Sequence, residues 1–151
     1  MKIKLFALIA FVFSALTSAQ VFAHHSFAAE FDAKKPLLLH GTVVKVEWTN
    51  PHTYLFVEVE NDDGSYDTWG LEMGSPNGLM RRGWTRNTLP VGTEVIVKGS
   101  QARDGSLKGN VQSVVIAATC QRLFAGTSQK DFVEGEASDA ANCNLDKDTS
   151  R

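Results

Sequence analysis

Scarce cysteine and the absence of a basic excess limit what this chain can be. It has two cysteines in 151 residues, Cys120 and Cys143, and no Cys-x-x-Cys motif, which disfavours a thiol redox centre. No paired carboxylates, Ser-His-Asp order or Cys-His couple stands at a recognisable spacing, so we predict a binding protein and not an enzyme. The apolar run from Leu5 to Leu16 is too short to span a bilayer.

That short apolar run belongs to a leader. Lys2 and Lys4 precede it, and Val21-Phe22-Ala23 follows it with small residues at the −3 and −1 positions of a signal-peptidase site. We therefore predict a signal peptide over residues 1–23, cleaved after Ala23. The mature protein is expected in the periplasm, with no membrane span after cleavage.

The charge balance of the mature chain argues against nucleic acid as a partner. Removing the two lysines of the leader from the 15 basic residues leaves 13 against 17 acidic ones. Six of the acids lie beyond Lys130, so residues 24–130 carry 11 basic and 11 acidic side chains. A nucleic-acid-binding domain normally shows a basic excess on its folded part. The expected partner is an envelope protein or a small ligand, and the oligomeric state is not predicted.

Alternating apolar residues predict a strand-rich domain. The segments at 42–48, 53–60, 66–73, 93–98 and 109–117 have the period-2 pattern of half-buried strands. In the first, Val44, Val46 and Trp48 share a face and Val43 takes the other. Ser75-Pro76 has the cap and first residue of a short helix, and Gly83 is a plausible left-handed stop.

This element order indicates the fold class. Three strands, a short helix and two strands is the order of the OB-fold, so we predict a mainly β, five-stranded, partly open barrel with a helix between strands three and four. The expected organisation is a signal peptide (1–23), an N-terminal arm (24–39), an OB-like barrel (40–119) and a polar acidic tail (120–151).

Five segments carry a resemblance to a known family. These motifs are His24-His25-Ser26-Phe27, Gly41-Thr42-Val43, Glu47 to His52, Glu72 to Asn77, and Arg81 to Thr85. In them the chain resembles a family of small exported bacterial proteins catalogued as DUF6152, from His24 to about Phe124. That family has no established activity, ligand or site residue to carry over. More loosely, the chain is similar to periplasmic bacterial OB-fold proteins, an analogy of fold only.

The histidines suggest a metal site. Cleavage after Ala23 would give His24 a free amine and an imidazole for the same ion, and His52 on the rim between the first two strands, or His25, would complete the site. Nitrogen ligands of this kind suit copper above all. The simpler interpretation is that the His-His start is only what the peptidase exposes, and that His52 bonds within its own turn.

A second candidate site is aromatic. Tyr54 and Phe56 fall on the strand face opposite the core residues, where OB-folds receive ligands or partners. Alternatively, the arm with Phe27 and Phe31, or the segment around Leu123 and Phe124, covers this face.

Two further clusters have mainly structural interpretations. Arg81, Arg82 and Arg86 could hold an anion, but such a group more often caps a helix and pairs with acids such as Glu72 or Asp67. In an oxidising compartment Cys120 and Cys143 are expected to form a disulfide that tethers the tail, contributing on the order of 3 kcal/mol.

Overall fold

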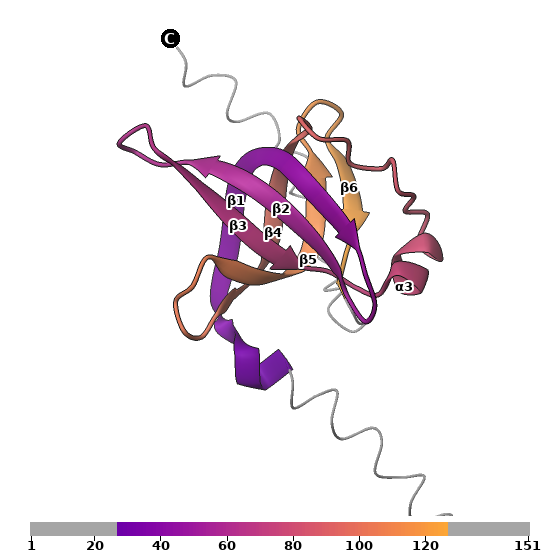
Figure 1. Cartoon of the computed structure of the whole chain (residues 1–151), viewed down its shortest axis with the longest axis horizontal. Coiled ribbons are helices and arrows are strands. Elements are labelled where there is room, and N and C mark those ends of the chain that lie inside the picture. Colours follow the sequence, from indigo (N-terminus) through magenta and orange to yellow (C-terminus); the bar gives the residue numbers. More distant parts are fainter. Residues whose placement is uncertain (1–26, 127–151) are drawn as a thin grey trace, which may run out of the picture.

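The computed structural model describes residues 27–126, and more than half of these residues lie in strands. A helical segment at residues 27–30 leads into the first strand. The elements are β1 (Phe31–Trp48), β2 (Thr53–Glu60), β3 (Tyr66–Glu72), α3 (Pro76–Met80), β4 (Glu94–Ala102), β5 (Lys108–Ile116) and β6 (Gln121–Phe124) (Figure 1).

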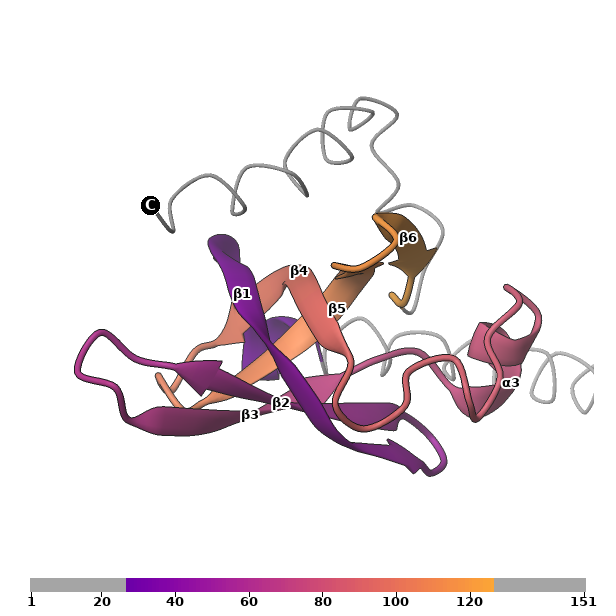
Figure 2. The same cartoon turned by 90° about the horizontal axis from the view of Figure 1, so that it is seen from above.

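The strands form one sheet that closes on itself. Their order is β3-β2-β1-β4-β5-β6, with antiparallel neighbours, and a parallel pairing of β3 with β5 joins Gly70–Glu72 to Lys108–Asn110. Figure 2 shows the strands crossing around a common interior, with α3 at one end. The predicted mainly β, partly open, OB-like barrel with a helix between strands three and four is confirmed. A sixth strand, β6, extends it along the edge of β5.

The interior is filled by the residues that the period-2 pattern placed inside. Leu55 and Val57 of β2, Leu71 of β3, and Val95 and Val97 of β4 are almost fully buried. Because successive side chains of a strand point to opposite faces, the intervening residues of β2 lie on the outer face of the sheet. The sequence pattern therefore identifies correctly which side of β2 faces the core.

The phase predicted for the first strand is wrong at one position. Val43 is fully buried, although the alternation places it opposite Val46 and Trp48, which also pack against the core. The reason is a bulge: the register with β2 shifts between Val43 and Lys45, so Val44 is an extra residue. An inserted residue resets the alternation, which a strict period of two cannot anticipate.

Two strands extend past the predicted segments. β1 begins at Phe31, inside the segment expected as an arm, and Phe31 aligns with Ala102 of β4. β6 lies in the segment expected as the start of the tail and pairs with β5 from Ser113 to Ile116. With β6 beside it, β5 is paired along both edges from Ser113 to Ile116, and Val114 and Val115 in this stretch are both buried.

The short helix has the predicted cap. The Ser75 hydroxyl accepts a hydrogen bond from the Gly78 amide at 3.2 Å, and Pro76 occupies the first helical position. Gly83 has φ 89°, the left-handed conformation expected at the stop. In the part of the chain described, no helix is long and apolar enough to cross a membrane.

Several predictions fall outside the described residues. These are the signal peptide over 1–23, the ligands His24 and His25, and the acidic tail with Cys143. The disulfide between Cys120 and Cys143 accordingly stays a prediction, as do the domain boundaries.

Candidate functional site

The turn between β1 and β2 fixes His52 beside the end of β3. The Thr49 hydroxyl donates to the His52 carbonyl at 2.8 Å, which closes the turn. On the other side, the Thr53 amide donates to the Gly74 carbonyl at 3.1 Å, and the Met73 amide donates to the Thr53 carbonyl at 2.8 Å. The His52 ring Nδ1 consequently lies 3.2 Å from the Met73 carbonyl oxygen.

Four side chains from three strands and the turn meet on the outer face of the sheet, and we call them the Glu72 cluster. Tyr54 of β2 and Asn110 of β5 both align with Glu72 of β3. Asn110 Nδ2 donates to Glu72 Oε1 at 3.2 Å, and Tyr54 and Glu72 each affect the pKa of the other. His52 Nδ1 lies 3.7 Å from Glu72 Oε1. The cluster therefore comprises His52, Tyr54, Glu72 and Asn110.

The carboxyl at the centre of this cluster is poorly solvated. The Glu72 side chain is 14% exposed, and burial raises its pKa above the ordinary value. The charge of Glu30 adds to this rise in pKa, whereas the His52 charge and the hydrogen bonds from Asn110 and Tyr54 oppose it. Burial also raises the pKa of Tyr54, followed by the charges of Glu72 and Glu30. The charge of Glu30, in the helical segment at 27–30, thus acts on two members of the cluster.

Phe56 extends the same face with an apolar surface. It aligns with Gly70 of β3, and a Cβ added to Gly70 would lie 3.7 Å from the Phe56 ring. Lys45 Nζ lies 5.4 Å from the centre of that ring and also pairs with Glu47. Tyr54 and Phe56 are both half-buried, so part of each ring is accessible. Carboxyl, hydroxyl, amide and aromatic groups therefore share one accessible surface.

The segments proposed to cover this face have other contacts. The Phe27 ring lies 5.7 Å from that of Phe31, which is itself 3% exposed. Phe124 packs under the Arg82 guanidinium, whose carbon lies 4.7 Å from the ring centre. None of these ring contacts involves Phe56, whereas the charge of Glu30, in the segment at 27–30, does act on Tyr54.

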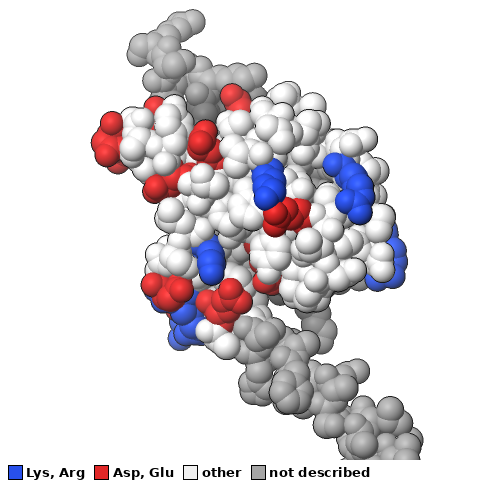
Figure 3. Space-filling model, viewed as in Figure 1, with Lys and Arg blue, Asp and Glu red and all other residues white. Residues whose placement is uncertain are grey.

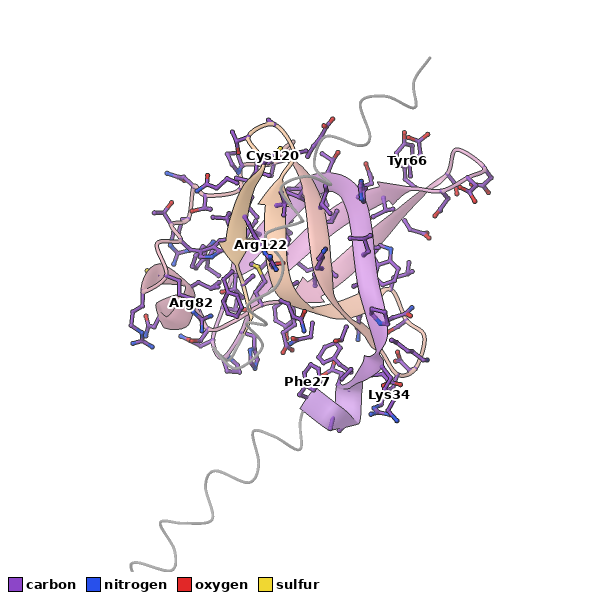
Figure 4. All side chains as sticks on the ribbon, turned by 180° about the vertical axis from the view of Figure 1, so that it is seen from behind. Phe27, Lys34, Tyr66, Arg82, Cys120 and Arg122 are labelled. Atoms are coloured by element: carbon purple, nitrogen blue, oxygen red, sulfur yellow. The ribbon has the colours of Figure 1, made fainter. Side chains whose placement is uncertain are left out.

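The arginines are engaged with carbonyls and rings instead of the predicted acids. Arg82 donates to the Gly126 carbonyl, and Arg86 lies 5.7 Å from the Trp48 ring. Between them Trp84 is buried, and its Nε1 donates to the Phe124 carbonyl at 2.9 Å. Figure 4 shows Arg82 beside α3. These contacts agree with a structural role for the arginines. The partners found for Arg82 and Arg86 are carbonyl oxygens and aromatic rings, and not the predicted Glu72 and Asp67.

Charge is distributed unevenly over one side of the molecule. On the face seen in Figure 3, acidic side chains gather at the free end of the β2–β3 hairpin, where Asp62 and Asp63 lie, and basic ones are scattered, some toward α3 and others beside acidic side chains at the lower left. No broad basic surface crosses this view, in line with the even charge balance of residues 24–130.

Of the predicted metal ligands, His52 is the one that the structure describes. Residues 27–126 contain no group of three or more His, Cys, Asp or Glu side chains that could hold a metal ion. The contact between His52 and Met73 indicates the tautomer of the neutral His52 ring. Because a carbonyl oxygen only accepts hydrogen bonds, the proton lies on Nδ1 and points at Met73, and Nε2 keeps a lone pair. Whether His24 or His25 approaches that nitrogen lies outside the described residues.

Sequence reasoning missed Glu72 and Asn110 as site residues. The available signal was the phase of the third strand: Leu71 and Met73 are core residues, so the acid between them must face outward. Asn110 had no comparable signal because 38 residues separate it from Glu72.

Comparison with known proteins identifies one relationship. The sequence model of a family of unknown function, DUF6152, matches residues 12–112, about two thirds of the chain. Neither the search of curated proteins nor that of solved structures found a match. The matched range contains the whole Glu72 cluster and ends before β6.

Proposed function

This chain belongs to the DUF6152 family of unknown function, and we propose that it is an exported accessory protein of the periplasm that binds a partner or small ligand. The proposed binding surface is the outer face of β2 and β3. It is formed by Tyr54 and Phe56 and by the other members of the Glu72 cluster. The proposed activity is recognition and includes no chemical reaction.

One observation carries this proposal: Glu72 is nearly buried, although no lysine or arginine contact to it is found among residues 27–126. Withdrawing a carboxylate from water costs free energy that neutral hydrogen bonds only partly offset. Its closest basic neighbour is His52, which is charged only when protonated. A carboxyl group held in this state beside an accessible aromatic ring is better explained by recognition than by stability, because a buried structural carboxylate is usually paired.

Export is the part of the proposal that rests on the leader. The Lys2, Lys4 and Leu5–Leu16 pattern and the small residues before His24 support cleavage after Ala23. Cell fractionation followed by N-terminal sequencing tests this directly. A periplasmic product beginning His-His-Ser supports export, and a cytoplasmic product retaining Met1 would reject it.

Recovery of a partner tests the binding face. Tagged mature protein and its Phe56→Ala variant are compared in pull-downs from periplasmic extract, with Tyr66→Ala as the matched aromatic control. Tyr66 is 60% exposed and lies near the free end of the β2–β3 hairpin, away from the cluster (Figure 4). We expect the wild type and Tyr66→Ala to recover the same species and Phe56→Ala to lose it. Equal recovery by all three proteins would place binding elsewhere.

Metal binding is a second candidate function, favoured by the fixed tautomer of His52. A ring whose Nδ1–H donates a hydrogen bond to a backbone carbonyl leaves Nε2 available as a metal ligand. The proposed ligands are the amine and imidazole of His24, with His52 or His25 completing a copper site.

A further inference from the structure

The side chains on the outer face of β2 and β3 specify the chemistry of a partner. We propose that this face binds an extended basic segment of another protein, with one arginine of that segment on Glu72 and a second on Glu58. This inference rests on the proposed function and adds to it the kind of partner that the face recognises.

The first step is that two carboxylates lie at either end of an aromatic pair. In antiparallel strands, directly opposed residues point to the same side of the sheet. Glu72 of β3 aligns with Tyr54 of β2, and Gly70 aligns with Phe56. Glu58 is two residues beyond Phe56 and therefore lies on the same side of β2. Tyr54 and Phe56 thus separate the two carboxylates on one face.

The second step is that the basic side chains of this region already have acidic neighbours. Lys45 of β1 pairs with Glu47. Hydrogen bonds from Ser106 lower the pKa of Asp104, and the charge of Lys108 adds to this fall. Within residues 27–126, no ion pair with lysine or arginine is found for the two carboxylates that border the aromatic pair. The face therefore has negative charge in excess, which a basic partner would neutralise.

The third step is that Glu72 is the stronger anchor of the two. Its side chain is 14% exposed, so water screens its charge poorly. Burial raises the pKa of Glu72, and the charge of Glu30 raises it further. Asn110 Nδ2, which donates to Oε1 at 3.2 Å, holds the carboxyl in place. A cation beside this carboxylate would favour its ionised form and so offset the cost of burial.

The fourth step is that the aromatic rings favour arginine over lysine. Tyr54 and Phe56 are both half-buried, so part of each ring can be contacted. Phe56 already attracts a cation, because Lys45 Nζ lies 5.4 Å from the centre of its ring. A guanidinium is planar and can donate to a carboxylate while it stacks on a neighbouring ring, which an ammonium group does less well.

The fifth step is that the distance between the carboxylates sets the spacing of the arginines. Tyr54, which aligns with Glu72, is four residues from Glu58, about 13 Å along β2. In an extended segment lying along β2, side chains four residues apart have the same separation and point to the same side. The side chain midway between them would contact Phe56. The expected motif is two arginines four residues apart with an apolar residue halfway.

The charge of the face also argues against other occupants. A second copy of this chain docked through the same face would place carboxylates against carboxylates, which costs free energy. Nucleic acid would bring its phosphates to the same carboxylates. A basic protein segment is the occupant that meets both the charge and the spacing.

Binding of a synthetic peptide to the mature protein, residues 24–151, tests the inference. The peptide has five residues, with arginine first and fifth and leucine third, and fluorescence anisotropy at low salt gives its Kd. We expect binding to be lost when citrulline, a neutral analogue, replaces both arginines. Binding should weaken when the second arginine is moved to the fourth position, since the two side chains then point to opposite sides. These comparisons use the wild-type protein and so do not depend on how a variant folds.

Variants of the protein locate the two arginine sites. Glu72→Gln should weaken binding of the peptide roughly 10- to 100-fold, as expected for loss of a hydrogen bond between charged groups. Glu58→Gln should weaken it roughly 2- to 5-fold, the range of a surface ion pair. Asp62→Asn is the matched control, because it removes the same charge from an exposed position in the β2–β3 turn. It should bind the peptide like the wild type.

The outcomes separate this inference from the proposed function. Equal binding of the arginine and citrulline peptides, or equal affinity of the wild type and Glu72→Gln for the arginine peptide, rejects the basic partner. A dimer of the protein that Glu72→Gln dissociates would assign the face to a second copy and reject it too. If Phe56→Ala still loses its partner in the pull-down, the binding face stands with a partner of different chemistry.

Discussion

Two regions of the molecule hold polar side chains beside aromatic rings, but they differ in how well those polar groups are satisfied. Where α3 meets β6, the Trp84 indole donates to the Phe124 carbonyl, and Arg82 donates to the Gly126 carbonyl while stacking on Phe124. On the outer face of β2 and β3, Glu72 is nearly buried and has neutral partners plus a histidine. The first region joins two chain segments, whereas the second leaves a charge without a permanent counterpart.

The difference indicates what each region contributes. A donor matched to a carbonyl stabilises the fold, and the single N–H of the Trp84 indole is used up in this way. A carboxylate withdrawn from water without a fixed cation lowers the stability of the fold. A bound partner that supplies the missing counter-charge would offset that cost. We therefore assign stability to the α3–β6 region and recognition to the Glu72 cluster.

The largest expected effect on stability is in the α3–β6 region. Trp84→Ala removes a side chain that is 3% exposed together with its hydrogen bond to Phe124, and should lower the free energy of unfolding by about 4 kcal/mol. Chemical denaturation measures this, with Trp84→Phe as a smaller change that keeps an aromatic ring. A loss below about 1 kcal/mol for Trp84→Ala would contradict the structural assignment.

Arg82→Met should have an intermediate effect. It removes the hydrogen bond to Gly126 and the stacking on Phe124 while keeping an unbranched side chain, and should cost about 1 kcal/mol of unfolding free energy. Partner recovery by this variant should equal that of the wild type. Loss of the partner at unchanged stability would move recognition to the arginines.

The Glu72 cluster should make the free energy of unfolding depend on pH. Burial raises the pKa of Glu72 in the folded protein above its ordinary value of 4.5, so its contribution to stability is full below that value and is lost as pH rises through the folded-state pKa. In metal-free buffer, the unfolding free energy of the wild type minus that of Glu72→Gln should therefore fall as pH rises from about 4. Denaturant titrations at a series of pH values measure it, and a difference that grows with pH would show that Glu72 is well paired.

The smallest effect is expected at the exposed edge of the same face. Lys45 pairs with Glu47, and their side chains are 60% and 38% exposed, so Lys45→Ala should change the unfolding free energy by less than about 0.5 kcal/mol. Thermal unfolding in low and high salt measures this. A larger loss would indicate that Lys45 acts mainly by packing on Phe56.

The sequence predicts local features of this fold well. The buried face of β2, the Ser75 cap and the left-handed Gly83 each depend on residues within a few positions of one another. Such features follow from alternation and capping rules alone.

Features that depend on distant segments were missed. The extra residue Val44 shifts the phase of β1, and a count of alternating residues cannot register it. β6 has four residues, and its place in the sheet comes from pairing with β5. The Glu72 cluster likewise needs the parallel pairing of β3 with β5, which brings Asn110 to Glu72.

Photo-cross-linking in living cells tests the central claim most directly. A photoreactive phenylalanine analogue is placed at position 56 on the outer face of the sheet, and in a separate strain at position 81, where Arg81 is exposed just after α3. The account predicts a cross-linked species from position 56 that is absent from position 81. Adducts formed from position 81 and none from position 56 would contradict it.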